Sequence, residues 1–199
     1  FTGGSRMIQN QIMTPGETYI LGALLLITGS IIGLYLAYER GVFLLLIGAM
    51  GLFSGYYYTA PPIFFAGRGM GELLVGLNFG VLSVAGSYYV QTQDISFTAV
   101  FASLPLLFLI AAILYINEFP DYDADKAVGK NHLVVYLGME RARWGFLFIV
   151  AGAYISIIAG VILDLLPITA LFVMPAAIFG IKAVKGLFKN YKKTTELIP

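Results

Sequence analysis

A short charged segment interrupts an otherwise apolar chain at residues 117–130. It reads Asn-Glu-Phe-Pro-Asp-Tyr-Asp-Ala-Asp-Lys-Ala-Val-Gly-Lys and places four carboxylates and two lysines within fourteen residues. Asp121 and Asp125 are four residues apart, so on a helix their side chains project from one face, about one turn from each other. Mg²⁺ is commonly held by one or two such carboxylates, and substrate phosphate oxygens fill its remaining positions. The segment therefore predicts a Mg²⁺ site that binds a diphosphate.

Asn117 continues the four-residue spacing toward the N-terminus and is a third candidate metal ligand. Pro120 lies between Asn117 and Asp121, and proline disfavours helical geometry at the residue before it. Regular helix is therefore not expected at Phe119.

The acidic segment allows two other interpretations. An EF-hand calcium loop needs glycine at its sixth position and a bidentate glutamate at its twelfth, whereas counting from Asp121 gives Lys126 and His132. A merely solvated acidic loop is the other interpretation, and it is the common outcome for a charged loop between helices. Features elsewhere in the sequence are needed to choose between a solvated loop and a metal site.

The composition indicates a membrane protein. Of 199 residues, 59% are hydrophobic and 12% are charged, and the mean hydropathy is +0.85. Uncharged runs are near or above the length that crosses a hydrocarbon core of about 30 Å. They predict an all-α bundle of six transmembrane helices at 19–38, 42–57, 72–91, 97–116, 144–163 and 166–182. Pro167 and Pro175 interrupt the last helix, and neighbouring helices can bond the backbone groups that proline leaves free.

The basic residues fix the expected orientation. With six spans, eleven of the twelve Lys and Arg residues fall on one side, and Arg40 alone falls on the other. The positive-inside rule places the richer side in the cytosol. We expect an integral protein of the cell's plasma membrane, with its site loops cytosolic and with no nucleic-acid partner. The chain has no cysteine, so a disulfide framework or a thiolate site is not available.

Three further polar positions share that predicted cytosolic side. The first is Phe1-Thr-Gly-Gly-Ser-Arg6, where adjacent glycines and an arginine suit a phosphate, although ordinary loops have this composition too. Tyr58 precedes the helix-ending pair Pro61 and Pro62, and it could equally be an interfacial belt residue. Arg68 follows in the same loop and offers another guanidinium.

Two residues close to the third predicted span are polar. Glu72 stands at its start and Asn78 inside it, and polar groups in such places are candidate functional residues. Asn78 could also simply hydrogen-bond a neighbouring helix. His132 is the single histidine, and the sequence assigns it no role beyond that of a hydrogen-bonded loop residue.

Together these residues fit a substrate with a charged head and an oily tail, such as a polyprenyl diphosphate. Its allylic C–O bond ionises when the charge on the departing diphosphate is neutralised by Mg²⁺ with lysine and arginine. Aromatic faces would shield the carbocation, and exclusion of water would protect it from hydrolysis. The candidate diphosphate-binding residues are Arg6, Arg68, Lys126 and Lys130, and Tyr58 and Asn78 are further substrate-binding candidates.

At these motifs the chain resembles the UbiA superfamily of intramembrane prenyltransferases, and most of all its MenA-type branch, which prenylates dihydroxynaphthoate. The family motif Asn-x-x-x-Asp-x-x-x-Asp, followed by Gly-Lys, matches Asn117, Asp121, Asp125, Gly129 and Lys130. The branch features are the segments 1–6, 68–72 and 78–92. The resemblance covers nearly the whole chain.

The resemblance implies a nine-helix bundle in which two aspartate-rich motifs face each other across a cavity and hold Mg²⁺. It also implies that 1–199 is a single domain and an internal fragment, which lacks the first motif, the helices before it and the last helix. Some members have a lysine four residues after the position of Tyr58, where this chain has Pro62. Arg68 is then the expected substitute for that charge.

The leading hypothesis is therefore Mg²⁺-dependent transfer of a polyprenyl group to an aromatic quinone precursor within the lipid bilayer. Asp121 and Asp125 would be the catalytic, metal-binding pair. Other acceptors stay open, among them an archaeal glycerol-phosphate lipid, 4-hydroxybenzoate, haem and chlorophyllide. A cation transporter or channel is the non-enzyme alternative, but it predicts charged residues along a path inside the spans, and the uncharged runs contain none.

Overall fold

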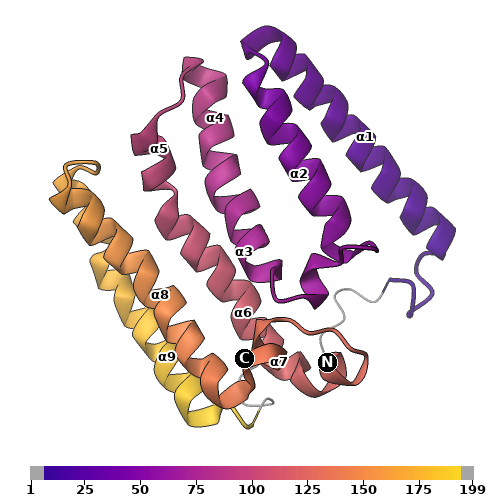
Figure 1. Cartoon of the computed structure of the whole chain (residues 1–199), viewed down its shortest axis with the longest axis vertical. Helices are drawn as coiled ribbons and strands as arrows, with labels where there is room; N and C mark the ends of the chain where they lie inside the picture. Colours follow the sequence, from indigo (N-terminus) through magenta and orange to yellow (C-terminus); the bar gives the residue numbers. More distant parts are fainter. Residues whose placement is uncertain (1–6, 194–199) are drawn as a thin grey trace.

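The computed structural model describes residues 7–193, so Arg6 and the Gly-rich segment before it lie outside the described residues. Six helical segments form the predicted bundle, and each runs antiparallel to the next one along the chain (Figure 1). Within the described range, five segments are long and apolar enough to cross a membrane. The remaining one, α2 (Phe43–Thr59), is apolar and has 17 residues. The prediction of an all-α, polytopic bundle is confirmed.

Three of the six segments are single helices, and the other three join two or more helical elements. The first is α1 (Pro15–Arg40) and the second is α2. The third joins α3 (Gly71–Gly76), the π-helix η2 (Leu77–Leu82) and α4 (Ser83–Thr92), and the fourth joins α5 (Phe97–Ala102) and α6 (Leu104–Ala127). The fifth is α8 (Met139–Ile162), and the sixth is the 3₁₀ helix η3 (Ile168–Ala176) with α9 (Ala177–Asn190).

The alternation of directions brings the functional loops to one end of the bundle. The loop between α2 and α3, which contains the short 3₁₀ turn η1 (Phe65–Gly67), lies at the same end as α7 (Leu133–Leu137) (Figure 1). The turns from α1 to α2 and from α4 to α5 lie at the opposite end. This is the arrangement that the six-span prediction requires.

The acidic segment continues a helix, which corrects the expectation for Phe119. Helix α6 runs without interruption through Pro120 to Ala127. Proline removes one backbone donor and disfavours helix at the preceding residue, but Phe119 is fully buried in the core beneath this turn. Packing of that aromatic side chain offsets the local cost, and Asn117 therefore shares one continuous helix with Asp121 and Asp125.

The main core lies where α6, α7, α8 and α9 meet at the functional end. It is built from buried aromatic and aliphatic side chains, namely Tyr115, Phe119, Val134, Ala142, Phe146 and Leu187. The hydroxyl of Tyr115 also donates to the carbonyl oxygen of Ala142 at 3.0 Å and so ties α6 to α8. This packing fixes the end of α6 that carries the acidic motif.

Two glycines let the third segment approach α6 closely. A Cβ atom on Gly80 would lie 2.7 Å from the backbone nitrogen and Cα of Leu107, and one on Gly76 would lie 2.8 Å from the Leu107 carbonyl oxygen. Small residues at helix contacts in membranes allow this kind of backbone approach. The backbone of Leu107 cannot move aside as a flexible side chain could.

Gly80→Ala is expected to lower the free energy of unfolding by about 1–3 kcal/mol, because the added methyl group overpacks this contact. The change in thermal stability of the purified protein in detergent measures it. Gly22→Ala in α1 is the matched control, since a Cβ there meets nothing within 4 Å, and it should leave stability unchanged or slightly higher. Equal effects of the two variants would contradict the close contact.

Candidate functional site

The acidic motif forms a row of polar side chains along the last turns of α6. Asn117, Asp121 and Asp125 follow one another at four-residue intervals in this helix, so neighbouring members are separated by about 6 Å along its axis. Asn117 is exposed, and the two aspartates are partly buried. The predicted one-face arrangement on a helix is confirmed, and their role as metal ligands stays a prediction.

Lys130 turns back onto the end of this row. Its Nζ atom lies 2.7 Å from Oδ2 of Asp125, and its backbone N–H donates to the carbonyl oxygen of Asp125 at 2.9 Å. Gly129 makes the reversal possible, because its φ of 74° lies in the left-handed region that favours glycine. Helix end and loop therefore place an ammonium group directly beside a carboxylate.

His132 is buried against the same helix, where the sequence predicted no role. Its side chain is 1% exposed; Nε2 lies 3.3 Å from Oδ2 of Asp125, and Nδ1 lies 3.2 Å from Oε2 of Glu118. Burial lowers the pKa of His132, against the opposing effect of Asp125, so the imidazole is neutral at pH 7. The sequence contained one signal for this position, namely a lone histidine directly after the acidic motif.

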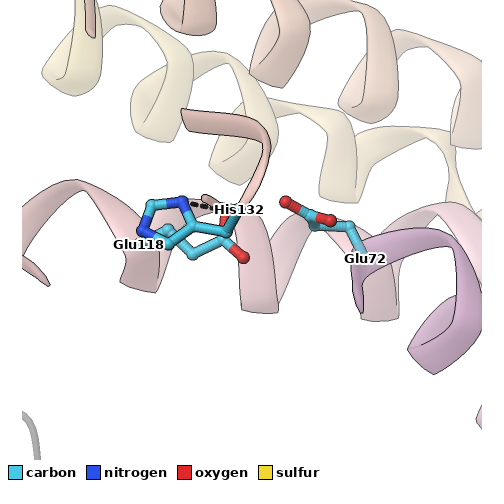
Figure 2. Close-up of side chains that lie close together, drawn as sticks. All are labelled: Glu72, Glu118 and His132. Atoms are coloured by element: carbon cyan, nitrogen blue, oxygen red, sulfur yellow. Dashed lines mark ion pairs between the residues drawn. The ribbon is translucent and has the colours of Figure 1, made fainter. Parts of the chain in front are cut away.

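Glu72 adds a second buried carboxyl group from the start of α3. Figure 2 shows Glu72, Glu118 and His132 close together, each from a different part of the chain. Glu72 is 2% exposed, and its Oε1 accepts the backbone N–H of Leu133 at 2.9 Å. This bond fastens the loop after α6 to the third helical segment.

Two groups of residues in this region could hold a divalent cation. The first is the row on α6, in which Asn117 is exposed and the two aspartates are partly buried. The second is Glu72, Glu118 and His132, whose potential ligand atoms lie within 4.8 Å of one another. Within residues 7–193, Oε2 of Glu72 and Oε2 of Glu118 have no hydrogen-bond donor. A proton or a cation must therefore compensate this buried pair.

Two other predicted diphosphate-binding residues, Arg68 and Lys126, lie at the same end of the bundle as the row, and Arg6 lies outside the described residues. Arg68 is exposed, and its Nη2 donates to the carbonyl oxygen of Pro62 at 2.8 Å, so the loop itself orients the guanidinium. Lys126 is exposed, with Nζ 5.4 Å from the centre of the Tyr122 ring. The structure thus brings Lys130 into contact with Asp125, while Lys126 and Arg68 face solvent.

An apolar groove of about 520 Å³ lies between α2 and the third helical segment. Asn78 lines it, accepts the hydroxyl of Ser54 in α2 at 3.0 Å, and donates to the carbonyl oxygen of Leu74 at 2.8 Å. The expected hydrogen bond of Asn78 to a neighbouring helix is confirmed, and its role in substrate binding stays a prediction. It stands in η2, and π-helical turns are frequent at functional sites.

Tyr58 connects the groove to the polar end. It lines the groove, and its hydroxyl would be 3.4 Å from a Cβ atom on Gly71, the residue before Glu72. The remaining groove residues are mostly aliphatic, aromatic or glycine. A charged head at the helix end and an oily tail in the groove is the ligand shape that this arrangement suits.

Comparison with known proteins agrees with this chemistry. Residues 4–197 match the UbiA prenyltransferase family. A 1,4-dihydroxy-2-naphthoate octaprenyltransferase of Bacillus subtilis is 30% identical over 160 residues, which cover 80% of this chain and 51% of that protein. A 2-carboxy-1,4-naphthoquinone phytyltransferase of Synechocystis is 29% identical over 140 residues, 70% of this chain and 45% of that protein.

A more distant relative matches along almost the whole chain. The UbiA prenyltransferase domain-containing protein 1 homolog of Drosophila melanogaster is 27% identical over 198 residues, 98% of this chain and 54% of that protein. The chain thus spans about half the length of these relatives. No solved structure is detectably similar to it.

Proposed function

The chain belongs to the UbiA prenyltransferase family, and from this we propose that its protein transfers a polyprenyl group from the diphosphate to a naphthoate-type aromatic acceptor within the membrane. The observation that carries the proposal is the row of Asn117, Asp121 and Asp125 on one continuous helix. An apolar groove lies in the same bundle, between α2 and the third helical segment. Two relatives named for naphthoate-type acceptors support the choice of acceptor.

We assign the metal site to the row on α6, with Asp121 and Asp125 as the principal ligands and Asn117 as the third. The donor set fits Mg²⁺, which prefers hard oxygen ligands and keeps positions for substrate phosphate. Mg²⁺ bound there would neutralise charge that develops on the departing diphosphate.

The remaining candidates would bind the two ends of the donor substrate. Lys130, Lys126, Arg68 and Arg6 would donate to phosphate oxygens, and Lys130 is placed best because it already contacts Asp125. The groove would take the isoprenoid tail and exclude water from the allylic carbon. Tyr58 stands between them, where its ring can face the allylic cation.

The same proposal places the protein in the bilayer of the plasma membrane with this end in the cytosol. Residues 1–199 form one UbiA-type membrane domain in this account. The support for its orientation is the concentration of lysine and arginine at the end that carries α7.

A reconstitution experiment tests the proposed activity. The full-length protein in liposomes is incubated with octaprenyl diphosphate and either 1,4-dihydroxy-2-naphthoate or 4-hydroxybenzoate, with Mg²⁺ or with EDTA. We expect prenylated naphthoate as the main product, with loss of product in EDTA. Prenylation of 4-hydroxybenzoate instead would overturn the acceptor, and cation flux without any prenylated product would overturn the enzyme assignment.

The groove gives a separate prediction about the donor's length. Gly55 lines the groove, and a Cβ atom there meets nothing within 4 Å, so Gly55→Leu fills the space without disturbing the packing. We expect the variant to lose activity with long prenyl diphosphates more than with short ones, by roughly 10-fold in the ratio of kcat/KM. Gly22→Leu on α1 is the control, and an unchanged ratio in Gly55→Leu would show that the tail lies elsewhere.

A further inference from the structure

The imidazole of His132 bridges two carboxyl groups of one helix. Glu118 and Asp125 are seven residues apart in α6, so they lie on the same face, two turns from each other. The ring lies between them, with Nδ1 3.2 Å from Glu118 and Nε2 3.3 Å from Asp125. Each nitrogen thus faces a different acid side chain.

Backbone contacts fix the direction of the ring. His132 is the N-cap of α7, and its Nδ1 accepts the backbone N–H of Val135 at 3.4 Å. An Nδ1 atom that accepts a hydrogen bond carries no hydrogen, so in the neutral ring the hydrogen is on Nε2. Nε2 lies 3.3 Å from Oδ2 of Asp125, a close contact that does not meet hydrogen-bond geometry in this structure. Glu72 holds the neighbouring residue, because its Oε1 accepts the N–H of Leu133.

Glu118 lies at the other end of the ring, where its Oε2 is 3.2 Å from Nδ1. It comes from the same helix as Asp125, so the ring spans two turns of α6.

We propose that His132 is a positioning residue, which holds the carboxylate of Asp125 in the orientation that binds the metal. His132 and Lys130 both contact Oδ2, which leaves the other oxygen, Oδ1, to a cation. Residues that contact a metal-ligating carboxylate without touching the metal orient that carboxylate and raise the affinity of the site for the metal. The inference rests on the proposed function, because it takes Asp125 as a metal ligand.

A pair of substitutions separates this role from simple helix capping. His132→Asn retains an oxygen near the place of Nδ1, which can cap α7, but its side chain is too short to reach Asp125. His132→Gln places an amide N–H near the position of Nε2, which can donate to Asp125. We measure the dissociation constant of Mn²⁺, as a stand-in for Mg²⁺, by electron paramagnetic resonance on the full-length protein without substrate.

We expect His132→Asn to weaken Mn²⁺ binding by about 10-fold and His132→Gln to keep it within about twofold of wild type. Unchanged binding in His132→Asn, or an equal loss in both variants, would overturn the positioning role. The melting temperatures of both variants measure the effect on the helix cap separately. If His132 only capped α7, His132→Gln would have the lower melting temperature and the weaker Mn²⁺ binding of the two variants.

Two further variants complete the test. Glu118→Gln keeps the size of the side chain and leaves the contact between Nε2 and Asp125 in place, so positioning predicts Mn²⁺ affinity close to wild type. A loss as large as that of Asp125→Asn would make Glu118 a direct ligand and would overturn the inference. If Asp125→Asn itself binds Mn²⁺ normally, the proposed metal site is wrong. If Asp125→Asn loses binding while His132→Asn does not, only the positioning role fails.

Discussion

Replacing Asp121 or Asp125 with asparagine is expected to lower kcat by about 10²- to 10³-fold, equivalent to roughly 3–4 kcal/mol of transition-state stabilisation. Each substitution removes one negative charge from the row that would hold the metal, while it keeps the size of the side chain. The loss should fall on kcat rather than on the acceptor's KM, because the metal acts on the departing diphosphate. Initial rates of prenyl transfer by the full-length protein in liposomes measure it.

Asp123→Asn is the matched control for that experiment. Asp123 lies on the same helix between the two proposed ligands and is exposed, but a two-residue offset turns its side chain away from their face. The variant has the same change in charge and should retain wild-type kcat. An equal loss in all three variants would indicate a general electrostatic effect of the segment rather than a metal site.

Lys130→Gln is expected to lower kcat/KM for the prenyl diphosphate by about 10- to 100-fold, as is typical when one charge-assisted contact to a substrate phosphate is removed. Lys130 is the one candidate cation that the structure, over the described range, places in contact with a proposed metal ligand, at 2.7 Å from Asp125. Its removal also frees Asp125 from an ion pair. Steady-state kinetics with the diphosphate as the varied substrate measure the effect.

Lys185→Gln controls for the overall loss of one positive charge. Lys185 is exposed on α9, away from the acidic row, and its substitution should leave kcat/KM unchanged. Lys126→Gln should have a smaller effect than Lys130→Gln, since Lys126 faces solvent beside Tyr122. The account is contradicted if Lys130→Gln stays within twofold of wild type.

The sequence was sufficient for the features that depend on local patterns. Apolar run lengths predicted the six helical segments. The positions of Pro61 and Pro62 predicted that the second helix ends before them, and the predicted end at 57 is two residues short of the observed Thr59. Four-residue spacing predicted the common face of Asp121 and Asp125, and the alternation of spans predicted that the polar loops share one end of the bundle. Predicting these features does not require knowing which residues distant in the sequence are in contact.

The remaining features depend on tertiary packing. Local preference argued against helix at Phe119, but burial of that side chain keeps α6 continuous through Pro120. Glu118 and His132 are separated by fourteen positions and by a tight turn, so their contact follows from the fold of the loop and not from any helical period. Glu72 joins them from α3, and only the packing of the third segment on α6 brings it there.

The central claim, that the row on α6 binds a divalent metal together with the substrate's diphosphate, is tested most directly by pulsed electron paramagnetic resonance. Mn²⁺ is bound to the full-length protein with an unreactive prenyl thiodiphosphate, and its hyperfine coupling to ³¹P is recorded. We predict a clear ³¹P coupling in wild type and in Asp123→Asn, and its loss in the double variant with asparagine at 121 and 125. An undiminished coupling in that double variant would contradict the account.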